Sequence, residues 1–330
     1  MLILAKAVLS MMIGFIISVI LGLILIPLLK KIKVKQKVSI FLAKKHKKKD
    51  GVPTMGGLIF IISTLLTLAF LLITNKIETS SHLLIVVFVF ISYGALGFID
   101  DYLIIKRRNN EGLKEWQKLI GQILIAIIFY ILYIKSGNEP RLYIYTLNIK
   151  IHMGVFYSLF ILFILVATSN AVNITDGLDG LAGGLSVMSF VAFGLIAWGC
   201  TWLTGHEEIA IFCFILVGSV LGFLVYNDYP AKIIMGDTGS LSLGATLASI
   251  AILTSHEVTL VIVAGVFVIE TLSCILQMVS GRYFGKRVFL MAPLHHHLEK
   301  MGWNERDIVK LFWVAGLILS MAAIAFGVWI

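Results

Sequence analysis

One aspartate of this sequence stands where a helix is expected to begin. Asp237 lies in the segment Gly-Asp-Thr-Gly-Ser, which follows a turn marked by Pro230 and opens an apolar run. Backbone N–H groups at a helix N-terminus attract anions, and carboxylates are preferred ligands of Mg²⁺. The segment therefore predicts a metal on Asp237 and a diphosphate on the amides. The alternative is that Asp237 or Thr238 only caps the helix.

Two further motifs combine acidic and amide side chains. Asp100 and Asp101 are adjacent. Because side chains of neighbouring helical residues point roughly 100° apart, these carboxylates need not share one task. Asn173, Asp176 and Asp179 recur every three residues, so they would share a face of a helical turn. Glycines among them allow close backbone approach, which suits a ribose, base or phosphate. The alternatives are a solvated helix end for the pair and a capping loop for the triplet.

Basic residues form two more candidate motifs. His295, His296 and His297 follow Pro293. Two helical histidines that share a zinc ion usually stand four residues apart, so three in a row favour phosphate contact or proton donation. A pH-sensitive surface patch is the alternative. Lys49 closes a lysine-rich loop that is expected to orient the protein and meet anionic lipid, and Lys49 itself is a candidate phosphate contact.

The elements that carry these motifs are predicted to be membrane helices. Of the 330 residues, 59% are hydrophobic and 14% charged, whereas soluble domains are nearer half apolar and a quarter charged. We expect one all-α polytopic membrane domain over residues 1–330, with about ten transmembrane helices. The apolar runs that predict them cover residues 9–29, 57–74, 83–99, 119–134, 153–171, 181–203, 209–226, 241–256, 259–279 and 308–330.

Charge predicts the orientation of these helices. The five loops on one side carry 21 of the 27 lysines and arginines, which places them in the cytoplasm and both termini outside. The motifs lie on that side, so we expect an active site at the cytoplasmic face of the membrane. An alternating pattern over residues 141–152 predicts a small external β-hairpin.

Two other functional classes are less consistent with this pattern. A cation-coupled transporter predicts carboxylates near the membrane midplane, whereas the acidic motifs here stand at one membrane face. The net charge of +9 is explained by topology and phospholipid contact, so no nucleic-acid partner is expected.

The five motifs, in this order, resemble the polyprenyl-phosphate N-acetylhexosamine-1-phosphate transferase superfamily. They read Pro-Thr-Met-Gly-Gly, Asp-Asp, Asn-x-x-Asn-x-x-Asp-Gly-x-Asp-Gly-Leu, Met-Gly-Asp-x-Gly-Ser and Pro-Leu-His-His-His-x-Glu, within residues 49–299. Each motif alone is a weak signal, whereas the ordered set is specific. The triple histidine points to the branch that uses UDP-N-acetylmuramoyl-pentapeptide. The alternative is the branch that transfers N-acetylglucosamine 1-phosphate from UDP-GlcNAc.

The resemblance implies that phospho-N-acetylmuramoyl-pentapeptide moves from its UDP-linked donor to undecaprenyl phosphate, giving lipid I and UMP for peptidoglycan. It implies Mg²⁺ as the cofactor, a homodimer in membrane lipid, and sensitivity to tunicamycin. Two mechanisms are open. The polyprenyl phosphate, oriented or deprotonated by Asp100, attacks directly, or Asp101 forms a covalent phospho-intermediate.

The resemblance also implies roles for single positions, with Asp237 as the Mg²⁺ ligand. Two positions depart from the family, since Arg108 replaces a lysine and Ile234 replaces an aromatic residue that stacks on uracil. Stacking contributes about 1–3 kcal/mol per base, so weaker uracil binding is expected. The implied catalytic residues are Asp100, Asp101, Asp237, His295, His296 and Lys49. The implied substrate-binding residues are Thr54, Arg108, Asn173, Asp176, Gly177, Leu178, Asp179, Asn227, Gln277 and His297.

Overall fold

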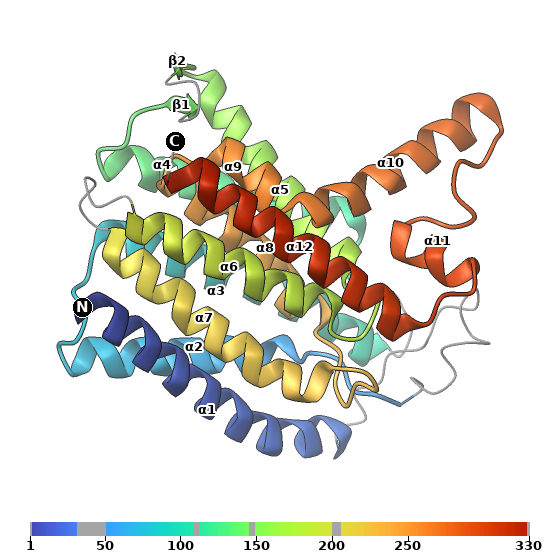
Figure 1. Ribbon diagram of the computed structural model, residues 1–330, viewed down its shortest axis with the longest axis horizontal. Helices are drawn as coiled ribbons and strands as arrows, with labels where there is room; N and C mark the ends of the chain where they lie inside the picture. Colours follow the sequence, from blue (N-terminus) through green and yellow to red (C-terminus); the bar gives the residue numbers. More distant parts are fainter. Residues whose placement is uncertain (1, 32–50, 108–111, 145–148, 200–205, 329–330) are drawn as a thin grey trace.

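The computed structural model describes residues 2–31, 51–107, 112–144, 149–199 and 206–328. The described elements are helices apart from two short strands, which confirms the all-α membrane architecture (Figure 1). In chain order they are α1 (Leu2–Lys31), α2 (Gly57–Ile73), α3 (Ser81–Arg107), α4 (Glu115–Lys135), β1 (Arg141–Ile144), β2 (Ile149–His152), α5 (Phe156–Thr175), α6 (Leu181–Gly199), α7 (His206–Asn227), α8 (Gly236–Leu253), α9 (Glu257–Val263), α10 (Gly265–Phe284), α11 (Leu294–Lys300) and α12 (Glu305–Val328).

Eight of the described helices are long and apolar enough to cross a membrane, namely α1, α3, α4, α5, α6, α7, α10 and α12. Two other expected spans, over 57–74 and 241–256, are present as α2 with 17 residues and α8 with 18 residues. The expected span over 259–279 is interrupted, because α9 ends at Val263 and α10 begins at Gly265. Beyond this break α10 extends away from the other helices (Figure 1).

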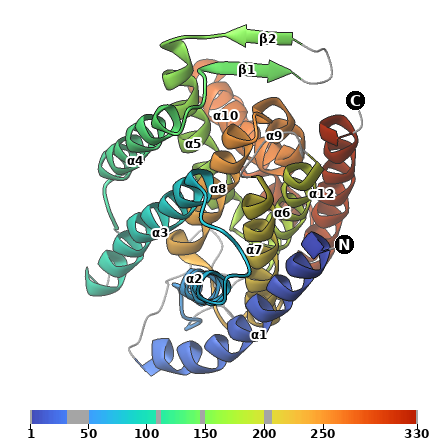
Figure 2. The same cartoon turned by 90° about the vertical axis from the view of Figure 1, so that its left-hand side faces the viewer.

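Helix α8 lies at the centre of the fold. Every residue from Thr238 to Leu253 is buried, and α3 and α5 pack closely along it (Figure 2). Small residues permit this packing, since a Cβ added at Gly244 would lie 2.5 Å from the carbonyl oxygen of Thr168 on α5. The first turn of α8 is therefore held by protein contacts on several sides.

The outer helices present apolar side chains on the surface. Leu23 on α1 is 64% exposed, Met278 on α10 is 66% exposed and Ile318 on α12 is 61% exposed. Such an extensive apolar surface is covered by lipid in a membrane protein. Together with the eight apolar helices, it identifies a multi-pass membrane protein.

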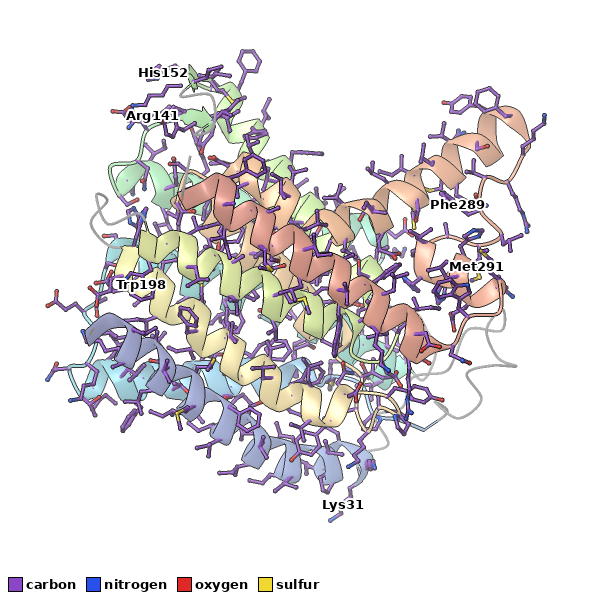
Figure 3. All side chains as sticks on the ribbon, viewed as in Figure 1. Lys31, Arg141, His152, Trp198, Phe289 and Met291 are labelled. Carbon is purple, nitrogen blue, oxygen red and sulfur yellow. The ribbon has the colours of Figure 1, made fainter. Side chains whose placement is uncertain are left out.

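The predicted β-hairpin is confirmed. Strands β1 and β2 pair antiparallel, with Arg141 opposite His152 and Ile144 opposite Ile149. The hairpin lies at the opposite end of the structure from α11 and the loop that precedes it (Figure 3). Its position outside the cell, and that of both termini, stay predictions.

Candidate active site

Asp101, near the end of α3, caps the first turn of α8. Its carboxylate accepts hydrogen bonds from the backbone N–H groups of Asp237 (3.3 Å) and Thr238 (3.0 Å) and from the Thr238 hydroxyl (2.6 Å). These N–H groups have no partner within their own helix, so a carboxylate from a neighbouring helix satisfies them. The capping role that the sequence left open for Asp237 or Thr238 is thus performed by Asp101.

The turn before α8 requires a glycine. Gly236 has a φ of +74°, and an added Cβ would lie 2.5 Å from an Asp101 carboxylate oxygen and 2.7 Å from the Thr54 hydroxyl. Backbone hydrogen bonds from Gly56 and Gly57 to the residues just before Gly236 hold this turn, at 2.8 and 2.9 Å. The structure therefore brings together the Pro-Thr-Met-Gly-Gly, Asp-Asp and Met-Gly-Asp motifs, which are far apart in the sequence.

Asp100, Lys118 and Asp237 form the charged centre of the site. The Lys118 ammonium contacts Asp237 Oδ2 and lies 3.3 Å from Asp100 Oδ2. The other oxygen of Asp100 accepts the backbone N–H of Leu113 at 2.8 Å. Asn173 on α5 donates its amide to Asp237 Oδ1 at 2.8 Å. Helices α4, α5 and α8 thus meet at the Asp237 carboxylate, whose two oxygens have different partners, and Lys118 links it to Asp100 of α3.

The histidine motif forms the short helix α11. His295 is fully buried and donates from its backbone and ring nitrogens to Glu270 of α10, at 3.1 and 2.9 Å. His296 contacts Glu299 of its own helix at 2.7 Å. The Nε2 atom of His295 would lie 2.3 Å from a Cβ added at Gly177. His295 therefore adjoins the acidic motif, one helical turn beyond Asn173.

Two of the implied substrate-binding residues brace the loops around the site. Asn227, at the end of α7, accepts the Gly180 N–H at 3.1 Å and donates to the Ile233 carbonyl at 2.9 Å. Asp179 accepts the Ala231 N–H at 3.0 Å, and its own N–H donates to Glu305 of α12 at 2.8 Å. These bonds join the acidic motif to the segment that leads into α8.

Gln277 and His297 hold the loop between α10 and α11. Gln277 accepts the N–H groups of Val288 and Phe289, at 3.1 and 2.9 Å, and donates to the Phe289 carbonyl at 3.1 Å. His297 accepts the Leu290 N–H at 3.1 Å. In the described structure both side chains thus make loop contacts, and their substrate contacts stay predictions.

Some predicted site residues are placed less directly. Lys49 and Arg108 lie outside the described residues. Asp176 is half-buried on the same turn as Asn173, and Leu178 is buried. Ile234 is half-buried two residues before Gly236, so no aromatic ring occupies that position.

The donor set of the charged centre suits Mg²⁺. Asp100 and Asp237 supply carboxylate oxygens, which hard cations prefer as ligands, and Asn173 orients Asp237 by donating its amide N–H to Oδ1. Lys118 between the carboxylates demonstrates that this position accommodates positive charge. The described residues hold no cluster of three or more His, Cys, Asp or Glu side chains placed to bind a metal. Phosphate and water would therefore complete the coordination, as is usual for Mg²⁺.

Three residues of the site were missed in the sequence. Glu270 stands in an apolar segment, where an ionisable side chain is itself a signal of function, whereas Lys118 immediately precedes the apolar run over residues 119–134. Glu305 begins α12, and its bond to the Asp179 backbone left no mark in the local pattern. The sequence therefore offered a signal for Glu270, whereas it did not indicate the partners of any of the three residues.

A charged centre at one end of a bundle of apolar helices defines a membrane-embedded enzyme. The chain belongs to glycosyl transferase family 4, whose family model matches residues 82–255. Relatives with the name phospho-N-acetylmuramoyl-pentapeptide-transferase are similar over nearly the whole chain. That of Geobacillus sp. (strain WCH70) is 48% identical over 98% of both chains. That of Bacillus subtilis (strain 168) is 47% identical over 97% of this chain and 98% of its own.

Proposed function

We propose that this protein transfers phospho-N-acetylmuramoyl-pentapeptide from its UDP-linked donor to undecaprenyl phosphate, giving lipid I and UMP in peptidoglycan biosynthesis. The name and full-length similarity of the relatives support this substrate pair. The structural observation that carries the proposal is the centre where Asp100, Lys118 and Asp237 meet. Phosphoryl transfer depends mainly on positioning and charge stabilisation, and this centre is built for both.

We further propose Mg²⁺ as the cofactor, with Asp237 as its protein ligand and Asp100 beside it. When bound, the ion would neutralise diphosphate charge and stabilise the UMP leaving group. Asn173 fixes the orientation of Asp237 by binding Oδ1, so Oδ2 is the oxygen presented to a cation. Lys118 keeps both carboxylates oriented toward the same point.

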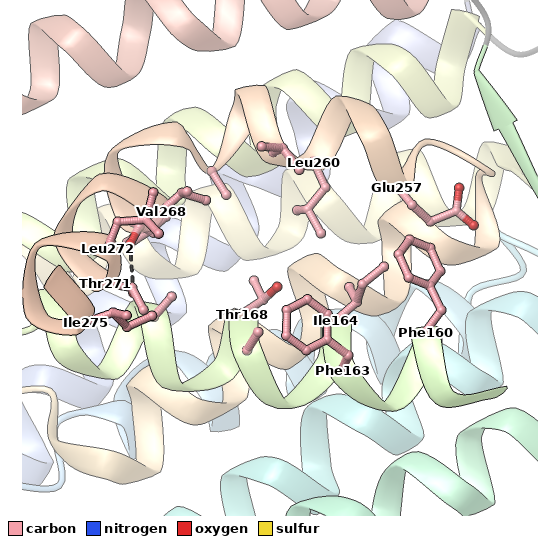
Figure 4. Close-up of a pocket in the computed structure, with 15 residues that line it drawn as sticks. Phe160, Phe163, Ile164, Thr168, Glu257, Leu260, Val268, Thr271, Leu272 and Ile275 are labelled. Atoms are coloured by element: carbon pink, nitrogen blue, oxygen red, sulfur yellow. Dashed lines mark hydrogen bonds between the residues drawn. The ribbon is translucent and has the colours of Figure 1, made fainter. Parts of the chain in front are cut away.

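An apolar groove beside the site supports a lipid acceptor. It has a volume of about 340 Å³ and lies between α5 and the α9–α10 pair (Figure 4). Phe160 and Phe163 line it on one side and Leu260 and Val268 on the other. The lining continues along α5 to Ala171, two residues before Asn173. An isoprenoid chain in this groove would bring its phosphate toward the charged centre.

The hydrogen bonds of Asp101 favour direct displacement over a covalent intermediate. Both of its oxygens accept bonds from the first turn of α8, and the residue is only 3% exposed. Attack by Asp101 on phosphorus would break this cap, whereas Asp100 already lies in the charged centre. We expect inversion of configuration at the transferred phosphorus. Retention would indicate two displacements and a covalent intermediate.

The cytoplasmic position of the site and the homodimer are also proposals. The excess of lysine and arginine in the loops on the side of the motifs supports the cytoplasmic position. Sealed vesicles supplied with the UDP-linked donor from outside test it. Turnover is expected in inside-out vesicles, and turnover confined to right-side-out vesicles would reverse the orientation.

The decisive assay follows UMP release by the purified protein. We expect release only when a polyprenyl phosphate, UDP-N-acetylmuramoyl-pentapeptide and Mg²⁺ are present together. Release with UDP-GlcNAc, and none with the muramoyl donor, would assign the chain to the GlcNAc-1-phosphate branch. Ion flux into vesicles without sugar transfer would support a transporter instead.

Gly177→Ala is expected to lower the rate of UMP release by about tenfold to a hundredfold. The new methyl group would lie 2.3 Å from His295 Nε2, so either the histidine or the loop must shift, and small misplacements are costly in catalysis. Gly281→Ala on α10 is the matched control, because an added Cβ there meets nothing within 4 Å. Equal rates for both variants would separate Gly177 from the site.

A further inference from the structure

A buried carboxylate in α10 has no role in the mechanism described so far. Glu270 is fully buried in an apolar helix, five residues beyond its first residue, Gly265. Burying an ionised side chain inside a membrane protein is costly unless it is paired and hydrogen-bonded. Both oxygens of Glu270 accept hydrogen bonds from His295, one from the backbone N–H at 3.1 Å and one from ring Nδ1 at 2.9 Å.

This pairing determines which nitrogen of His295 carries the ring proton. An ionised carboxylate accepts hydrogen bonds but cannot donate them, so Nδ1 must be the donor in the pair. In the neutral ring the other nitrogen, Nε2, is then unprotonated. The bond to the backbone N–H also fixes the start of α11 against α10.

The second nitrogen of His295 is buried and unused. Its Nε2 atom has no hydrogen-bond partner within the described part of the chain. It is directed at Gly177, where an added Cβ would lie 2.3 Å away. Gly177 follows Asn173 by four residues, and Asn173 donates to Asp237. An unpartnered polar atom that is buried at the edge of the site indicates a partner supplied by substrate.

We propose that Glu270 is a positioning residue that holds His295 with Nδ1 protonated, so that Nε2 is the atom that meets the substrate. This inference rests on the proposed function and deepens it. A proton taken up or released by His295 during transfer moves through Nε2, while the Nδ1–H bond to Glu270 persists. The carboxylate also stabilises the imidazolium form when Nε2 holds a proton.

The neighbouring pair of His296 and Glu299 differs from Glu270 and His295 in the helices that it joins. His296 and Glu299 stand three residues apart on α11, so their contact is local and moves with that helix. Glu270 and His295 are 25 residues apart and join two helices. The Glu270–His295 pair therefore fixes α11 and a histidine ring relative to the bundle that carries Asp237.

Kinetics of single and double variants test the proposal. Glu270→Gln keeps the side-chain volume but no longer specifies a proton on Nδ1. We expect it to lower kcat for UMP release by about tenfold to a hundredfold, the usual effect of removing a partner that orients a ligand histidine, with KM changed less than about threefold. His295→Gln should lower kcat at least as much. The double variant Glu270→Gln/His295→Gln should be no slower than His295→Gln alone, because Glu270 acts through His295.

The matched control is Glu208→Gln near the start of α7. It changes a half-buried carboxylate of an apolar helix, 19 residues before Asn227. Wild-type kcat is expected for this control. A further loss of tenfold or more in the double variant, beyond His295→Gln, would overturn the proposal, as would wild-type kcat in Glu270→Gln.

A spectroscopic measurement of the His295 tautomer uses the wild-type protein, so it does not depend on whether a Glu270 variant folds. In protein labelled with ¹⁵N-histidine, the His295 signals are identified by their loss in His295→Gln. At pH 8 we expect a protonated Nδ1 and an unprotonated Nε2. The opposite tautomer would overturn the inference even in an active enzyme. If the wild-type protein releases no UMP, the proposed function fails, whereas the tautomer measurement still decides the pairing.

Discussion

Asp237→Asn should reduce turnover by about 10³-fold and remove the dependence of any residual rate on Mg²⁺. Asp237 meets Asn173 through one oxygen and Lys118 through the other, so its carboxylate is the shared element of the charged centre. The amide keeps the shape of the side chain but carries no charge for a divalent cation. The measurement is the initial rate of UMP release over a series of Mg²⁺ concentrations.

Asp307→Asn serves as the control for this experiment. It makes the same chemical change on an exposed residue of α12 and should retain the wild-type rate and Mg²⁺ response. If Asp237→Asn kept the Mg²⁺ dependence of the wild type, another group would be the ligand. The charged centre would then have to be reassigned.

Lys118→Met is expected to lower turnover by about 10²–10³-fold at every Mg²⁺ concentration. The ammonium lies between Asp100 and Asp237, and methionine fills the same space without charge or hydrogen bonds. Two carboxylates then face each other without a fixed cation, so stability should also fall, by about 1.5–3 kcal/mol. UMP release and thermal unfolding in detergent measure the two effects.

A second substitution tests whether the loss of stability comes from the two opposed carboxylates. Asp100→Asn in the Lys118→Met background removes one of the two opposed charges, so stability should recover in part. Activity should not recover, because the ammonium that orients the Asp237 carboxylate is still missing and the carboxylate of Asp100 is lost as well. Recovery of both would mean that neither Lys118 nor Asp100 is needed for the transfer.

The main architecture was predictable because membrane helices leave a strong signal. Long apolar runs and the alternation over residues 141–152 gave the helical class and the hairpin, and both are confirmed. The break at Ala264 was not predictable, since the run from Val258 to Val268 is apolar apart from one threonine and glycine and contains no proline. Periodicity does not distinguish one long buried helix from two that meet at an angle.

Most residues of the site were predictable from the sequence, whereas the contacts between them were not. Helix ends at one end of the bundle bring Asp100, Asn173 and Asp237 together, as the placement of their motifs indicated. Their individual roles stay predictions. The partners Lys118 and Glu270 depend on how α4 and α10 rotate about their axes, which short motifs do not specify.

The enclosure of α8 has a consequence for the surroundings in which this protein works. A bilayer that is thicker or thinner than the apolar belt is accommodated by tilting of helices that touch lipid. From Thr238 onward α8 is shielded from the acyl chains, and Asp237 stands at its beginning. The geometry of Asp237, the proposed Mg²⁺ ligand, is therefore insulated from the composition and thickness of the membrane, and the peripheral helices absorb such changes.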